Sequence, residues 1–182
     1  MLKDYSGEFI PDIRLQDFSK DALVRLVEAA SKDYIGLDGL WLAAIRRRYG
    51  DKVAFDCSKE VWDVGYLHEI QRGTRAMNIS GDDIATMFKY FQIDPGFGAM
   101  FKVKCELRNP DLGVVTVTHC NTLNYAERHK KPELQKLACV ELDLPLFAKT
   151  AHLFNPNIKV KPLKLPPRKS PDEIACQWEF SI

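Results

Sequence analysis

The sequence predicts an α+β fold, in which an N-terminal helical cluster packs on a four-stranded, mostly antiparallel sheet with one crossover helix. Three observations predict it. Apolar residues recur every three or four positions up to about residue 97, and beyond it they alternate in two pairs of short runs. The charge balance changes at the same place, since residues 1–97 hold 13 basic and 16 acidic residues and residues 98–182 hold 13 and 9. We therefore expect a helical part, 1–97, and a sheet part, 98–182, that share one core.

Helices are expected throughout the first part. Ser19 is a typical N-cap for the first of them, and Gly50 is a typical stop for the second. The expected helices cover about residues 20–30, 32–49, 59–77 and 82–94.

The second part has the order ββαββ. A turn at residues 109–113 joins the first two strands into a hairpin. Pro162 lacks a backbone N–H, so its strand is expected at an edge of the sheet. Pro145 lies inside the crossover helix and should break, kink or restart it. The expected strands cover about residues 99–108, 113–120, 158–165 and 175–182, and the helix covers 133–154.

Composition narrows the classes of function. The chain has 26 basic and 25 acidic residues among 182, which argues against binding nucleic acid or an anionic membrane through bulk charge. No window holds the roughly 18 apolar residues of a membrane-spanning helix, and the first residues lack the pattern of a signal peptide. We expect a cytoplasmic protein with five reduced cysteines. Its oligomeric state stays open, a homodimer included.

Two carboxylates lie on or beside apolar helix faces. Asp38 follows the spacing of Tyr34 and Trp41, and Glu69 follows that of Trp62. If the two helices pack on these faces, Asp38 and Glu69 can meet, as paired carboxylates do in acid–base sites. The alternatives are structural: Asp38 bonded to a neighbouring helix end or lying at the edge of its stripe, and Glu69 paired with the next basic residue along its helix.

Four of the five cysteines fall in the second part. Their spacing contains no CxxC, so no local zinc or iron–sulfur motif is present, and we expect no metal ligands. Buried, inert thiols are one reading of Cys120, Cys139 and Cys176. The other is a nucleophile or a discontinuous metal site built from these three. Glu141 would lie near the Cys139 thiol if that segment is extended.

A scattered set of residues resembles a prokaryotic family of uncharacterised cytosolic proteins. It looks related to the L-2-amino-thiazoline-4-carboxylate hydrolase-like group and, more distantly, to 4-vinyl-reductase-type ligand-binding domains. The resemblance implies a helical lid over a ββαββ sheet, with a small-molecule pocket between them. The residues that carry it are 37–41, Trp62, Glu69, Cys120, Arg128, Cys139, 147–148, 155–156, 166–167 and 176–180.

This family often has a further cysteine just before its Pro-Pro pair. Residues 160–165 contain no thiol, which counts against a four-cysteine metal site in this chain.

The leading hypothesis is a protein that binds a small molecule in a pocket between helices and sheet. One alternative is a thiol-dependent hydrolase of a C–N bond in a cyclic amino-acid-like substrate. Another is a metal-bound regulatory or interaction module. The sequence names no cofactor. The expected ligand-binding residues are Asp38, Trp41, Trp62, Glu69 and Arg128, and the candidate catalytic residues are Cys120, Cys139, Cys176 and Glu69.

Overall fold

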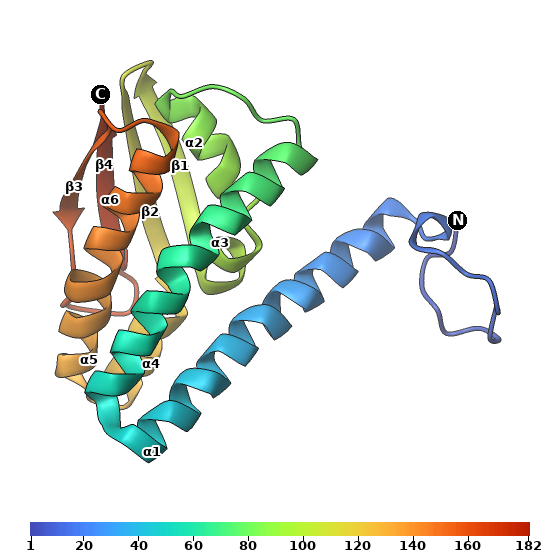
Figure 1. Cartoon of the computed structure of the whole chain (residues 1–182), viewed down its shortest axis with the longest axis horizontal. Coiled ribbons are helices and arrows are strands. Elements are labelled where there is room, and N and C mark those ends of the chain that lie inside the picture. Colours follow the sequence, from blue (N-terminus) through green and yellow to red (C-terminus); the bar gives the residue numbers. More distant parts are fainter.

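One antiparallel sheet organises the chain, and helices cover one of its faces (Figure 1). The structure is a computed structural model that describes residues 1–182. The four strands pair in the order β1-β2-β4-β3 and confirm the expected α+β class and the four predicted strands. Their bounds are β1 Phe101–Asn109, β2 Leu112–Cys120, β3 Lys159–Lys164 and β4 Cys176–Ser181.

The covered face of the sheet carries its apolar residues. In one row across the strands, Cys105 pairs with Val115 and Val115 pairs with Trp178, which is fully buried. The neighbouring row contains Gly113, where a Cβ atom would lie 2.5 Å from the Phe88 ring. This position therefore requires glycine, because the helix above the sheet leaves no space for a side chain.

The main core joins the two halves of the chain. Ile84, Met87 and Phe91 of α2 (Ile84–Phe91) pack with Trp178 and Phe180 of β4. The stripe expected from periodicity is thus buried against the sheet. Helix α3 (Pro95–Met100) follows directly and leads into β1.

The crossover between β2 and β3 consists of several helical pieces. Its elements are α4 (Asn121–Arg128), α5 (Pro132–Lys136), a π-helical segment η2 (Leu137–Leu142) and α6 (Asp143–Phe154). Pro145 lies in the first turn of α6, so the helix restarts just before it, as its missing N–H predicts. Pro162 lies on β3, which is an edge strand as expected.

The first three expected helices are one element, α1 (Lys20–Ala76), which reverses direction at Gly50 (Figure 1). The prediction of a third helix that begins only after Ser58 was therefore wrong. Gly50 has φ 82° and ψ 173°, a conformation that is open almost only to glycine. It ends one helical arm, residues 20–49, and starts the next, residues 51–76. Ser19 caps the first arm as predicted, accepting a bond from Ala22 N at 3.2 Å.

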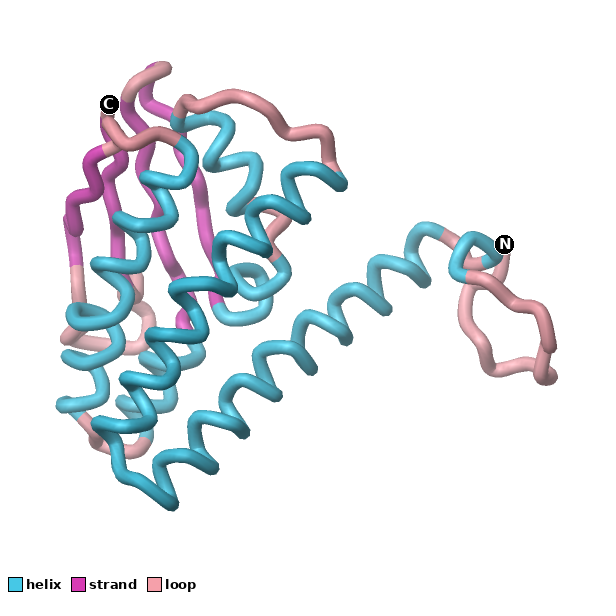
Figure 2. The backbone as a smooth tube through the Cα atoms, viewed as in Figure 1, coloured by secondary structure: helices cyan, strands magenta, loops and turns pink.

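The two arms have different surroundings. The second arm packs along α3 and α6, whereas the first arm diverges from the rest of the molecule (Figure 1). Residues 1–18 form a loop at the far tip of the first arm (Figure 2), with one short 3₁₀ turn η1 (Leu15–Asp17). None of the helices combines the length and the hydropathy that a membrane crossing requires.

Candidate functional site

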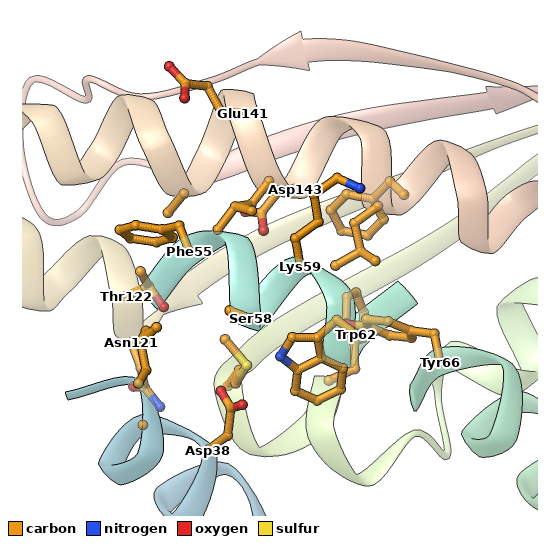
Figure 3. A pocket seen from close by; sticks show the side chains of 18 of the residues that line it. Asp38, Phe55, Ser58, Lys59, Trp62, Tyr66, Asn121, Thr122, Glu141 and Asp143 are labelled. Atoms are coloured by element: carbon orange, nitrogen blue, oxygen red, sulfur yellow. The ribbon is translucent and has the colours of Figure 1, made fainter. Parts of the chain in front are cut away.

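A cavity of about 840 Å³ lies between α1 and the crossover helices. Both arms of α1, α3, α4 and α6 contribute to its wall, and half of the 30 lining residues are hydrophobic. Figure 3 shows Phe55 and Trp62 on the α1 side of this space and Asp143 on the opposite side. The volume falls in the range that small-molecule sites occupy, and the mixture of aromatic walls with a few polar groups is typical of them.

Asp143 is a strongly perturbed carboxyl group in the wall of this cavity. Its carboxyl group accepts no hydrogen bond and forms no ion pair within the chain, and protein surrounds it so closely that burial raises its pKa to about 7. The side chain is nevertheless not sealed off, because part of its surface faces the cavity. A carboxyl group with such a pKa exchanges its proton near neutral pH, as a binding or acid–base group must.

Local helix geometry places Asp143. It is the first residue of α6, immediately after the π-helical segment, and Pro145 follows two positions later. A π-helical turn carries one more residue than an α-helical turn and therefore shifts the side chains that follow. We attribute the inward position of Asp143 to this shift together with the restart at Pro145.

Two other carboxylates that line the cavity already have partners within the chain. Asp63 lies 3.0 Å from Lys59 Nζ and 2.8 Å from Lys149 Nζ, and these bonds lower its pKa. Asp94 caps α3 by accepting a bond from Phe97 N at 2.8 Å, although burial raises its pKa. Both carboxylates have structural partners, whereas Asp143 has none and is free for a ligand.

Tyr66 adds a second polar group without a partner. Tyr66 lines the cavity, and its hydroxyl forms no hydrogen bond within the chain. Burial raises its pKa well above the usual value, and the nearby carboxylates of Asp94, Glu69 and Asp143 raise it further. The hydroxyl is therefore protonated at neutral pH and can donate a hydrogen bond to a ligand.

The predicted residues Asp38 and Trp62 both line the cavity. The indole N–H of Trp62 faces the Asp38 carboxylate (Figure 3). Burial raises the pKa of Asp38, and this contact with Trp62 partly offsets the rise. Trp41 instead lines a second cavity of about 350 Å³ between the two arms, which Asp38 also borders.

The structure does not bring Asp38 and Glu69 together at one site. Glu69 lies outside the cavity and accepts a hydrogen bond from the hydroxyl of Tyr34, which joins the two arms. Burial raises the pKa of Glu69, and the Tyr34 bond partly offsets the rise. Glu69 therefore serves to hold the arms together, and neither a paired-carboxylate site nor the expected ion pair along its helix is formed.

The three candidate thiols do not line the cavity. Cys120 and Cys139 are buried, and burial raises the pKa of Cys120 to about 11, that of Cys176 to about 12 and that of Cys139 higher still. Cys120 also caps α4 by accepting a bond from Leu123 N. A nucleophilic thiol needs a lowered pKa and access, so the inert reading is the better supported one.

Glu141 and Arg128 occupy the rim of the cavity. Glu141 is exposed on a helical segment and points away from the cavity (Figure 3), because the segment is not extended. Arg128, the last residue of α4, donates a bond to the carbonyl of Asn124 at 3.3 Å and has no carboxylate partner. It offers an uncompensated positive charge at the rim.

No group of three or more His, Cys, Asp or Glu side chains is arranged to hold a metal ion. The metal-bound module therefore gains no support.

Sequence reasoning missed Asp143 and Tyr66. Asp143 looks ordinary in the sequence, because acidic residues are common in the first turn of a helix. The one sequence feature that could have pointed to Asp143 was Pro145. A proline at which a helix restarts also marks the place where the side chains of that helix change direction.

The family profile described as "Family of unknown function (DUF6125)" matches residues 16–182, so the chain belongs to this family. No curated protein and no solved structure matches the chain significantly.

Proposed function

We propose that this member of a family of unknown function binds an apolar small molecule through a protonatable nitrogen placed on Asp143. The observation that carries the proposal is a buried carboxyl group without a partner in the wall of a large apolar cavity. Removing a carboxylate from water is costly unless it gains a partner, and a cationic nitrogen supplies one.

The surroundings suggest the rest of the ligand. Trp62 and Phe97 offer aromatic surface for its body, and the Tyr66 hydroxyl can donate a hydrogen bond to it. Arg128 at the rim would attract an anionic group at the other end of the molecule. An aromatic or heterocyclic amine, with or without a carboxylate, satisfies these groups together.

The test is a thermal-shift screen of aromatic and heterocyclic amines, followed by calorimetry on the hits. Asp143→Asn should weaken binding by at least about tenfold, since charge-assisted bonds contribute roughly 1.5–3 kcal/mol. Glu141→Gln is the matched control, because this carboxylate lies two positions earlier and points away from the cavity. If no amine binds, or if both variants bind equally well, the proposal fails.

A second candidate function is hydrolysis with Asp143 as general base. The pKa of about 7 favours it, because a base of this pKa can accept a proton from water at neutral pH. The resemblance to the L-2-amino-thiazoline-4-carboxylate hydrolase-like group makes a C–N bond in a cyclic amino-acid-like substrate the bond to test. Hydrolysis that survives Cys139→Ser and is lost in Asp143→Asn would distinguish this mechanism from a thiol mechanism.

We also propose a cytoplasmic location. All five cysteines are free thiols, which suits a reducing compartment.

A further inference from the structure

The first arm of α1 has a row of apolar side chains without a partner. We define its outer face by positions at alternate spacings of three and four residues, which is the seam spacing of packed helices. Leu40 is 70% exposed, Trp41 64%, Leu37 56% and Leu26 51%. The outer face consists of Leu23, Leu26, Ala30, Asp33, Leu37, Leu40 and Ala44, with Trp41 at its edge, where it also borders the cavity between the two arms.

The chain exposes more surface than a compact monomer of its mass. The chain exposes 11931 Å², whereas a compact monomer of 20.8 kDa exposes about 8,900 Å². The excess of about 3,000 Å² is several times the roughly 800 Å² that each partner buries in an interface of standard size. The diverging arm in Figure 1 is the visible source of this excess.

We propose that the C-terminal half of this outer face, from Asp33 to Arg48, packs against the same segment of a second copy of this chain, with the two arms antiparallel. A self-complementary contact of this kind forms a closed two-fold dimer. The contact is centred on Leu40 and Trp41, toward the C-terminal end of the face, and Leu23, Leu26 and Ala30 lie outside it.

Charge sets the direction of the two arms. Asp33 lies on the outer face and Arg48 continues it at the C-terminal end of the arm, and neither has an ion-pair partner in its own chain. A parallel pair would place each of these charges against its own copy, which is repulsive. The antiparallel pair places Asp33 against Arg48 of the partner subunit, on either side of the central leucine and tryptophan.

The dimer would also act on the cavity. The opposite side of the same arm contributes Asp38, Gly39 and Leu42 to the cavity wall. An arm held by a second copy has less freedom to swing away from the body. The dimer contact therefore fixes one wall of the ligand site without adding a residue to it.

The first experiment measures mass by light scattering across a micromolar concentration series. The wild-type chain should have twice its 20.8 kDa. Leu40→Glu should raise the dimer dissociation constant at least about tenfold, since a charge would replace a central apolar anchor. Ile182→Glu is the matched control, an exposed apolar residue at the C-terminus, 44% exposed and far from the arm, and it should remain dimeric. A wild-type monomer throughout the series, or a Leu40→Glu dimer of unchanged affinity, overturns the proposal.

A charge exchange tests the direction and does not depend on disturbing the apolar centre. Asp33→Arg alone and Arg48→Asp alone should each weaken the dimer, because each places like charges opposite one another. The double variant should recover the wild-type dissociation constant. If the double variant is no tighter than the single variants, the antiparallel arrangement is wrong.

Discussion

At Asp143, the fold keeps a carboxyl group in surroundings that disfavour its charged form. Its pKa rises from the ordinary 3.8 to about 7, so the folded state binds a proton more tightly than the unfolded state does. Below pH 4 the group is protonated in both states and costs nothing. As the pH rises from about 4 to 7, the unfolded state ionises first and the folded state loses stability relative to it. Above pH 7 the full destabilisation is reached, and it lowers the free energy of unfolding by on the order of 4 kcal/mol.

At pH 8, Asp143→Asn should therefore have a higher free energy of unfolding than the wild type, by at most about 4 kcal/mol. At pH 4 the two free energies should be close to each other. Urea unfolding at both values of pH checks this prediction. The Glu141→Gln variant is the control, since Glu141 is exposed. A difference between Asp143→Asn and wild type that does not change with pH would mean that Asp143 is not buried in this way.

The thiols of Cys120, Cys139 and Cys176 should resist a thiol reagent while the protein is folded. At pH 8, a pKa raised from 9 to about 11 or beyond leaves far less thiolate. We expect rates at least about tenfold below those of the same cysteines in denaturant. Labelling followed by mass spectrometry of the peptides assigns each rate. Fast labelling of Cys139 would support the hypothesis of a thiol-dependent hydrolase again.

At the scale of elements, Gly50 decides whether the two arms form a hairpin. Gly50→Ala should destabilise the chain by roughly 1–3 kcal/mol, because φ 82° with ψ 173° is strained for any residue with a Cβ atom. Gly36→Ala is the control. It lies within the first arm with nothing within 4 Å, and it should gain up to about 1 kcal/mol from helix propensity. Denaturant unfolding measures both, and equal effects would argue against the reversal at Gly50.

The same glycine shows where sequence reasoning succeeds and where it stops. Alternation identified β1 and β3, because a sheet with one covered face favours period two. The signal for β2 was its β-branched residues, since five consecutive positions of this strand are buried. Helical periodicity located the helical segments and marked Gly50 as a stop. Periodicity did not show that the expected helices 20–30 and 32–49 are continuous across residue 31. It also did not show that the next helix begins directly after Gly50. The reason is that periodicity does not report where one helix ends within a continuous amphipathic run.

The site was less predictable than the fold. Asp38 and Trp62 were found because they follow apolar stripes. The stripe beside Asp38 does not itself line the cavity, since Leu37 and Trp41 are largely exposed. Asp143 was missed because its property arises from what surrounds it after folding: a π-helical turn, a long helical arm and the absence of any partner. At neighbouring positions only Pro145 marks the place, and it does not show that the carboxyl group is buried without a partner.

The whole molecule exposes more surface than a compact monomer of its mass. If two copies pack together through the first arm of α1, the thermal stability of the protein depends on its concentration. Binding that exists only in the folded state stabilises it by mass action. For a dimer of two 182-residue chains, a tenfold rise in concentration should raise the Tm by about 2 °C. Leu40→Glu should abolish this dependence and Ile182→Glu should keep it. Scanning calorimetry of the three proteins at low and high micromolar concentration separates the cases. A wild-type Tm that does not move with concentration would mean that the exposed arm contributes nothing to stability through a second copy.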